Sequence, residues 1–462
     1  MTMADTSPAG LRPATGAGRG PAGAGYADTD GLDGVPAPSD GVPTFDGVPA
    51  FDGVLSTHDR DLAAASTDFG RHVHRRPSAV LRPAGASDVA AMVRFCRGSG
   101  LPVVARGTGH SVDGRALTQG GVVIDMTALA AVREPARDRV VVEAGARWSA
   151  VLEVTLAAGT APPVLPDYLG LSVGGVLAAG GISGASHRHG CLADHVHDLD
   201  VVTPSGALVT CSRTEHPALF DAVRGSQGRH GIIARATLAL TPAPTAARRY
   251  RLPYQELETF LADQQRLAAD RRFDHIEGHA AHAQDTGWGF TLSAVAAFDP
   301  PAEPDDRALI GDLAHDRAGE QIDTVPYRDF LHRAAPAEAR LRANGSWHHP
   351  HPRSTLLLPG RHAAALLSGA LRDLDPGDLG AGGQPLIYPI PTASILAPNV
   401  PRLRDPMTVV LSIPRTAPPD DPAALDRMRH ANDALRTAVE RAGGSCYPHD
   451  PAHFPAGDSY DA

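Results

Sequence analysis

Three glycine-rich segments, each set beside a strand-like run, constrain the fold of this protein more than any other feature. The first segment, residues 106–111, directly follows the apolar run 101–105 and places two glycines, one residue apart, before His110. Such a turn lets the backbone approach a ligand closely and present N–H groups to phosphate. No amphipathic helix follows, so the segment is not the fingerprint of a Rossmann fold.

The other two glycine-rich segments have a related character. The second runs through residues 167–190 and interleaves small with apolar residues, which leaves room for a large flat ligand. In the third, residues 219–233, a predicted helix ends in glycines and a strand begins at Gly231. A long uncovered glycine-rich loop would be costly in a core. We therefore expect these segments to line a common site.

Hydrophobic periodicity predicts an α+β fold with two folded domains. Before Pro242 and Pro244 the pattern gives strands at 79–81, 101–106, 121–125, 139–143 and 231–238, a hairpin at 199–209, and helices capped by Ser87 and containing Trp148. After them it gives a helix at 257–269 and strands at 290–297 and 408–412. The expected divisions are a tail at 1–55, a first domain at 56–245 and a second domain at 246–462.

The tail is expected to be disordered. It is rich in Gly, Pro, Ala and Asp, and Asp-Gly-Val-Pro recurs in it at residues 33, 40 and 46. A stretch of this kind cannot bury enough apolar surface to offset its conformational entropy.

Charge and composition exclude several classes of partner. The net charge of −10 argues against nucleic acid, which requires a basic face. No apolar run is long enough for a membrane span, and no signal peptide is evident, so we expect a cytoplasmic protein. The four cysteines form no CxxC pair, so neither a zinc ribbon nor a disulfide framework is expected. The histidine-rich runs 187–197 and 348–351 match no zinc spacing, and we expect no metal.

Taken together, the three segments resemble the vanillyl-alcohol-oxidase type of FAD-binding flavoprotein, and within it cytokinin dehydrogenase. The Gly-x-Gly-His-Ser motif of that family stands at 107–111, and its Asp-Tyr-Leu-x-Leu-Thr-Val-Gly-Gly block stands at 167–175, with Ser172 for Thr. Ile-Ser-Gly and Arg-His-Gly follow at 182–184 and 188–190. Later blocks of the family are similar to residues 275–278, 347–352 and 385–389.

The resemblance implies a two-domain fold of the PCMH type that holds FAD, bound covalently through His110. A covalent bond retains the flavin and raises its potential, which favours accepting hydride. A second, cysteinyl bond is not expected, because the berberine-bridge type has its cysteine near the position of Ser172. The implied cofactor contacts are Arg106, Gly107, Thr108, Gly109, His110, Ser111, Asp167, Tyr168, Ser172, Val173, Gly174, Ala178, Ile182 and Ile232.

The resemblance also implies oxidation of an N6-substituted adenine at the bond between the amine nitrogen and the first carbon of its substituent. Asp167 would accept the amine N–H, and Glu277 would accept hydrogen bonds from the purine. Trp347 and Tyr388 would line the substrate pocket. The electron acceptor would be oxygen or a quinone. Without the family motif, Asp167 is more typical of a turn, Glu277 of an exposed strand, and the aromatic residues of a core.

The sequence departs from the family pattern in ways that leave other functions open. Thr108 stands for Arg, Arg115 for Gln and Ala179 for Asn, and the C-terminal Trp-containing stretch of the family is not recognisable. One alternative is therefore a flavin oxidase of an alcohol, sugar or secondary metabolite. Another is an inactive homologue that lacks the C-terminal segment.

Overall fold

A computed structural model describes residue 45 and residues 47–448 of the protein. The protein divides into two compact units, residues 1–41 and 42–462, and every element below belongs to the second unit. Most of the tail expected at 1–55 lies outside the described residues. Its last part joins the fold: the Gly53 N–H donates to the Asp88 carboxylate at 2.9 Å, and a strand begins at Val54.

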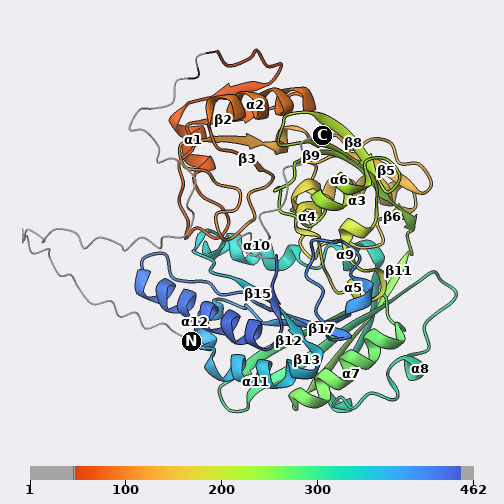
Figure 1. Ribbon diagram of the computed structural model, residues 1–462. Helices are drawn as coiled ribbons and strands as arrows, with labels where there is room; N and C mark the ends of the chain where they lie inside the picture. Colours follow the sequence, from red (N-terminus) through yellow and green to blue (C-terminus); the bar gives the residue numbers. More distant parts are fainter. Residues whose placement is uncertain (1–44, 46, 449–462) are drawn as a thin grey trace, which may run out of the picture. The chain divides into compact units, whose positions relative to one another are not determined.

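The first sheet has four strands in the order β1-β2-β4-β3. Figure 1 labels β2 and β3 of this sheet. Strands β2 and β3 both pair in parallel with β4, which lies between them. The apolar runs of β2 and β4 are buried, as is typical of parallel strands covered on both faces. Helix α2 is capped by Gly85, so the prediction that Ser87 caps it is wrong by two residues. The elements are β1 (Val54–Ser56), α1 (Asp59–Ala65), β2 (Ala79–Arg82), α2 (Ala86–Ser99), β3 (Val103–Arg106) and β4 (Val122–Asp125).

The second sheet is antiparallel and has the order β5-β9-β7-β8. The predicted hairpin is present as the pair of β7 and β8. Helix α3 buries Trp148, Val151 and Leu152 on one face, as its periodicity predicts. The elements are β5 (Arg139–Glu143), α3 (Trp148–Ala157), α4 (Val173–Ala179), α5 (Ser186–His189), β7 (Val196–Val202), β8 (Leu208–Ser212), α6 (Pro217–Val223) and β9 (Ile232–Ala239), with a two-stranded sheet of β6 (Thr160–Ala161) and β10 (Thr241–Pro242).

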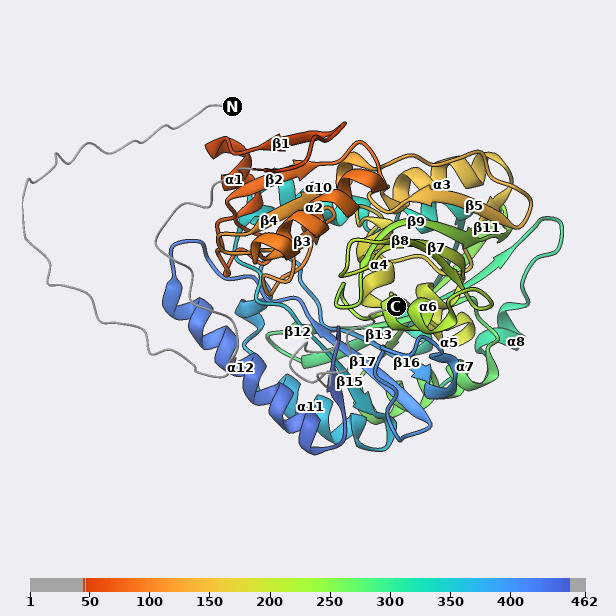
Figure 2. The ribbon, with the colours of Figure 1, turned by 45° about the horizontal axis from the view of Figure 1, so that its top comes forward.

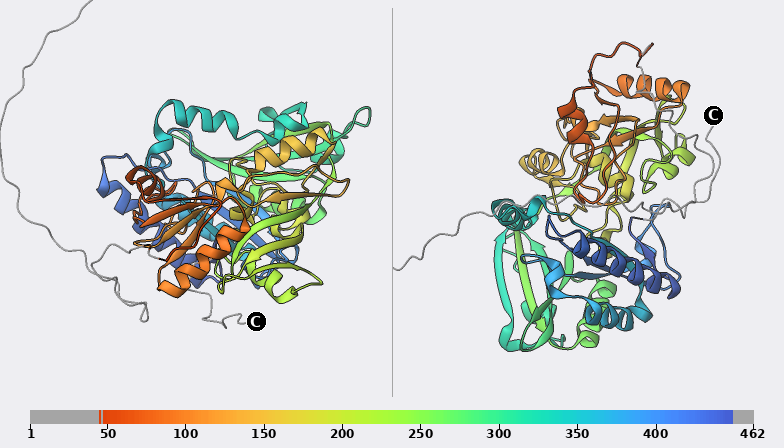
Figure 3. Two further views of the ribbon diagram at one scale, coloured as in Figure 1. Left: turned by 90° about the horizontal axis from the view of Figure 1, so that it is seen from above. Right: turned by 90° about the vertical axis from the view of Figure 1, so that its left-hand side faces the viewer.

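The third sheet has eight strands in the order β14-β11-β13-β12-β16-β17-β15-β18. Helices α11 and α12 lie side by side and both contact β15, while α7 contacts β13 and β16 (Figures 1 and 3). The strands are β11 (Ala246–Tyr254), β12 (His275–Ala283), β13 (Gly287–Phe298), β14 (Gln321–Pro326), β15 (Ser354–Pro359), β16 (Leu386–Pro391), β17 (Met407–Ile413) and β18 (Ser445–Cys446). The helices are α7 (Leu257–Asp270), α8 (Asp306–Ile310), α9 (Tyr327–Leu331), α10 (Ala335–Ala343), α11 (Ala363–Asp373) and α12 (Pro422–Arg441).

Short 3-10 helices connect these elements at Met126–Ala128, Leu192–Asp194, Arg317–Gly319, Ser346–His348, Gly360–His362, Pro376–Leu379 and Thr392–Ser394. Helix α5 packs on β12 and β16, which brings the second glycine-rich segment against the third sheet (Figure 2). No described helix has both the length and the apolar composition needed to cross a bilayer.

Side chains along the central strands of the third sheet point alternately to its two faces. One face packs into a core, and the other, called the site face, lines a pocket. Even-numbered residues such as Tyr250, Ile276 and Leu292 are buried in the core that also includes the apolar face of α7. Their odd-numbered neighbours point to the opposite face, because successive side chains of a strand alternate. Glu277 and Ser293 lie on that face and line a pocket.

Candidate active site

The glycine turn after β3 is built to receive phosphate. Gly109 has φ +69°, a conformation that glycine adopts without strain. The N–H groups of Thr108, Gly109 and His110 donate to no described residue. The Arg106 guanidinium folds against Gly109, where a Cβ would collide with it, and its buried Nη1 has no hydrogen-bond partner among the described residues. A buried cation beside free backbone amides fits the diphosphate of FAD.

The second glycine-rich segment meets the turn, and the third segment packs against the second. A Cβ on Gly107 would collide with the Ser172 hydroxyl, so these two residues touch. The Gly225 N–H donates to Leu177 O at 3.0 Å, and the Gln227 N–H donates to Ala178 O at 2.7 Å. These bonds hold the third segment against α4, which belongs to the second.

Several expected cofactor contacts have other partners. The N–H groups of Val173 and Gly174 donate to carbonyl oxygens of residues 146 and 144, at 2.8 and 2.7 Å, so these residues can meet a cofactor only through other atoms. The Ser111 hydroxyl donates to an Asp68 carboxylate oxygen at 3.1 Å. Ile182 and Ile232 are half-buried and pack against a core to which all three large sheets contribute.

His110 lies in an aromatic cluster. Its ring is 4.1 Å from Phe69, 4.8 Å from Tyr168 and 5.7 Å from Trp347, measured between centroids. Burial, assisted by the charge of Arg353, lowers the pKa of His110 to about 3. The imidazole is therefore neutral at physiological pH, and a neutral ring nitrogen retains the lone pair that a covalent bond requires. Sequence reasoning missed Phe69, because no motif contains it.

Four charged or titratable side chains meet at the edge of the site face. Arg333 Nη2 is 2.6 Å from Asp167 Oδ1, 3.1 Å from Glu277 Oε1 and 2.8 Å from His275 Nε2. His275 Nε2 is 3.3 Å from Glu277 Oε1 and 3.8 Å from Asp167 Oδ1. Asp167 precedes α4, His275 and Glu277 lie on β12, and Arg333 lies between α9 and α10. The structure thus joins the two predicted carboxylates and adds two partners that sequence reasoning missed.

The neighbours of the two carboxylates give them opposite pKa shifts. Burial, and then the charge of Glu277, raises the pKa of Asp167. Burial also opposes ionisation of Glu277, but Arg333 and His275 outweigh it and hold its pKa well below the ordinary value. For His275, burial is outweighed by the Glu277 carboxylate, which raises the pKa of the imidazole. Two carboxyl groups with divergent pKa values are typical of an acid–base site.

Asp167, His275 and Glu277 also form the only group of three potential metal ligands among the described residues. Arg333 already places a cation within hydrogen-bond distance of all three. The arrangement therefore resembles a salt-bridge network, not a metal centre. Elsewhere, His187 contacts two backbone carbonyl oxygens at 2.8 and 3.0 Å, which gives it a structural role.

The carboxylate pair opens onto a pocket of about 450 Å³. Trp347 and Tyr388, which were expected to line it, are not among its lining residues. Trp347 is part of the His110 cluster, and Tyr388 is buried at 3% exposure in a core to which all three large sheets contribute. The pocket role that the resemblance implied for both stays a prediction. Tyr388 still lies near the carboxylate pair, because burial and then the charges of Asp167 and Glu277 raise the pKa of its phenol. The lining residues are Asp167, Arg249, Tyr250, Arg251, His275, Glu277, His279, Ser293, Ala294, Val295, Phe330, Arg333, Ala334, Arg353, Gln384, Leu386, Ser412 and Pro414.

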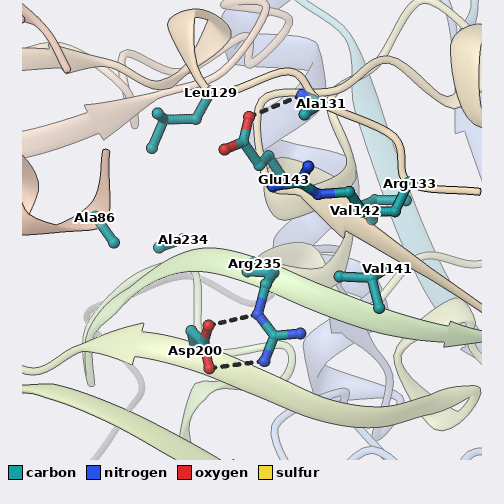
Figure 4. Close-up of a pocket in the computed structure, with 10 residues that line it drawn as sticks. All are labelled: Ala86, Leu129, Ala131, Arg133, Val141, Val142, Glu143, Asp200, Ala234 and Arg235. Atoms are coloured by element: carbon teal, nitrogen blue, oxygen red, sulfur yellow. Dashed lines mark hydrogen bonds and ion pairs between the residues drawn. The ribbon is translucent and has the colours of Figure 1, made fainter. Parts of the chain in front are cut away.

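A smaller cavity of about 120 Å³ lies beside β5 and β9 (Figure 4). Three of its charged groups have partners: Arg235 binds the Asp200 carboxylate, and the Glu143 carboxylate accepts the Ala131 N–H at 2.8 Å. It contains none of the residues singled out in the sequence. We therefore assign the chemistry to the larger pocket.

Comparison with known proteins identifies the class. A family model described as "FAD binding domain" matches residues 77–212, and one described as "Cytokinin dehydrogenase 1, FAD and cytokinin binding" matches residues 302–399. The crystal structure of 6-hydroxy-D-nicotine oxidase from Arthrobacter nicotinovorans has the same fold, with a TM-score of 0.68 and 21% identity over 86% of this protein and 88% of that one. The protein is a FAD-dependent oxidoreductase of the PCMH type, and the predicted α+β fold is confirmed.

Sequence relatives define the family more closely. Cytokinin dehydrogenase 5 of Oryza sativa subsp. japonica is 36% identical, covering 86% of this protein and 84% of its own length. Cytokinin dehydrogenase 4 of Arabidopsis thaliana is 34% identical over 76% of each protein. An uncharacterized oxidoreductase of the fasciation locus of Rhodococcoides fascians is 38% identical over 88% of this protein and 92% of its own length. The protein belongs to the cytokinin dehydrogenase family.

Proposed function

We propose that this protein oxidises an N6-substituted adenine at the carbon that joins the substituent to the amine nitrogen. The observation that carries the proposal is the pair of carboxylates, Asp167 and Glu277, on one wall of a pocket large enough for a small organic molecule. An adenine amine offers a matching pair of groups, because it presents an amine N–H beside a hydrogen-bonding ring.

Asp167 is suited to receive the amine proton. One of its oxygens, Oδ1, binds Arg333, and Oδ2 has no hydrogen bond to a described residue. The raised pKa makes the carboxylate a better base than an ordinary Asp. Glu277 stays ionised because of Arg333 and His275, and so serves as a permanent hydrogen-bond acceptor for the purine.

The reaction balances with these groups. FAD, which the glycine turn would hold and His110 would bind covalently, would supply the hydride acceptor. The carbon next to nitrogen loses a hydride, the nitrogen loses its proton to Asp167, and a C=N bond forms. Water then cleaves the imine to adenine and an aldehyde. Oxygen or a quinone takes the electrons afterwards, and we place the reaction in the cytoplasm.

The first test is an anaerobic absorbance spectrum of the purified protein before and after addition of isopentenyladenine. Bleaching of the flavin bands would support the proposal. A flavin spectrum that persists would favour an alcohol, sugar or metabolite as substrate. Purified protein without a flavin spectrum would favour the inactive homologue.

A variant pair ties this test to the carboxylates. Glu277→Gln should weaken isopentenyladenine binding, because a neutral amide accepts hydrogen bonds less strongly than a carboxylate. Asp285→Asn, which changes an exposed turn residue between β12 and β13, should behave as the unmodified protein. Equal affinity in all proteins would remove Glu277 from substrate recognition.

A further inference from the structure

Arg353 is one of four arginines that line the substrate pocket, with Arg249, Arg251 and Arg333, and its surroundings differ from those of Arg333. It directly precedes β15. Its guanidinium carbon lies 5.0 Å from the centroid of the Phe69 ring, which in turn stacks on His110 at 4.1 Å. Arg353 therefore marks the end of the pocket nearest the proposed flavin attachment.

This guanidinium has no counter-ion among the described residues. No described carboxylate lies within 4.0 Å of it, and its buried Nε makes no hydrogen bond there. Burial lowers the pKa of Arg353 to about 10, so the group remains charged at neutral pH. Arg333 and Arg415, in contrast, contact carboxylates at 2.6 and 3.0 Å.

A desolvated cation without a partner is costly, and proteins usually retain one where a ligand supplies the opposite charge. Arg106 shows the same pattern at the glycine turn, where the phosphates of FAD would supply that charge. Arg353 lies outside the turn and in the substrate pocket, so its partner would arrive with the substrate.

We propose that Arg353 binds an acidic group on the N6 substituent of the substrate amine, so that the preferred substrate is an anion. This inference rests on the proposed function. Asp167 and Glu277 would hold the N–H and the purine, and the substituent would then extend toward Phe69, His110 and Arg353. Guanidinium recognises a carboxylate or phosphate with two parallel hydrogen bonds, which gives selectivity as well as affinity.

The test compares two N6-substituted adenines with the same allylic substituent, one ending in a carboxylate and the other in the matching carboxamide. Anaerobic flavin bleaching gives kcat/KM for each. We expect the unmodified protein to prefer the carboxylate by at least about tenfold, which corresponds to about 1.4 kcal/mol. Arg353→Met should abolish the preference, and Arg353→Lys should retain part of it. Arg97→Met, an exposed change at the end of α2, serves as the control.

The outcomes separate this inference from the function on which it rests. If isopentenyladenine bleaches the flavin but the carboxylate is not preferred, the inference fails and the function stands. If Arg353→Met slows both substrates equally, Arg353 acts on the flavin or on the fold, and the inference also fails. A preference for isopentenyladenosine 5′-monophosphate alone would show that the favoured anionic group is on the ring side of the substrate and not on its N6 substituent. That result would also overturn the inference.

A second readout does not require turnover. Hexanoate should perturb the flavin absorbance, or the melting temperature of the purified protein, more than hexanamide does, and Arg353→Met should remove the difference. Failure of every adenine to bleach the flavin would refute the proposed function, while this measurement would still decide whether Arg353 binds an anion. Equal effects of the two probes would contradict the inference.

Discussion

Two carboxylates in one pocket, Asp167 and Glu277, have pKa values that their neighbours shift in opposite directions. Both are buried enough to feel desolvation, so burial alone does not distinguish them. The difference comes from the cations: Arg333 and His275 act most strongly on Glu277. The proposal thus gives two carboxylates that lie close together different roles: Asp167 is the base and Glu277 is a fixed anion.

This difference predicts the pH dependence of flavin reduction. Asp167 must be ionised to accept a proton, and its pKa is raised above the ordinary value of 3.8, so its ionised fraction falls at a higher pH than that of an ordinary Asp. Reduction by isopentenyladenine should therefore slow as pH falls, with an apparent pKa above that value. The Asp167→Asn variant should keep its flavin but lose this dependence on pH. Its flavin should be reduced at least about 100-fold more slowly than that of the unmodified protein. An unchanged rate or profile would exclude Asp167 as the base.

A second prediction for a single residue concerns His110. Its neutral imidazole, enclosed by Phe69, Tyr168 and Trp347, is the group proposed to carry the flavin. His110→Ala should release all flavin on denaturation, whereas the unmodified protein should keep a fluorescent band on a denaturing gel. His351→Ala, which removes another ring that stacks on Phe69, is the matched control and should keep the band. A fluorescent band in His110→Ala would refute the assignment.

Among the elements, the cofactor site depends on close approach between the glycine turn and the start of α4. Gly107 is required there for space and not for an unusual backbone angle, since its φ is ordinary. The neighbouring Gly109, with φ +69°, is required for the backbone angle as well. The two glycines of one motif are therefore required for different physical reasons.

This contact can be tested by adding one methyl group. Gly107→Ala should collide with Ser172, at a cost of about 1–3 kcal/mol, and lower the flavin content of the purified protein. The double variant Gly107→Ala with Ser172→Gly removes the colliding atoms and should recover flavin. Gly98→Ala, where a Cβ meets open space, should have no effect. Full flavin content in Gly107→Ala would mean that the turn shifts to accommodate the added methyl group, and it would contradict the prediction.

In the molecule as a whole, the cluster of Asp167, His275, Glu277 and Arg333 ties the glycine-rich part of the protein to the third sheet. Asp167 comes from the segment that leads into α4, while Glu277 and His275 come from β12. Arg333 binds both sides, so the active site and the contact between these parts depend on the same guanidinium.

Removing this guanidinium should therefore affect stability as well as activity. Arg333→Met removes the guanidinium that binds both carboxylates and leaves only His275 beside them. It should lower the free energy of unfolding by about 3 kcal/mol, as for other broken buried ion pairs. Calorimetry of flavin-loaded protein measures this loss. Combined with Asp167→Asn, the loss should be smaller than the sum of the single changes, because the neutral amide no longer repels Glu277. Additive losses would show that Arg333 and Asp167 act independently.

Sequence pattern was sufficient to establish most of the elements and the chemical class. Periodicity placed most strands and helices, because a buried face repeats every second residue in a strand and near every third or fourth in a helix. The motifs at 107–111 and 167–175 indicated the family, FAD, and the residues Asp167 and His110, and the later block at 275–278 indicated Glu277. The turn after β3 has the free amides that the motif predicts.

Packing in three dimensions was needed to find the residues that surround the reacting atoms. Phe69, His275, Arg333 and Arg353 belong to no phosphate-binding motif, and their roles arise from contacts between segments far apart in sequence. The local sequence pattern indicates which face of a helix or strand is apolar. The packing of these elements against one another decides which charged groups pair and which residues line a pocket.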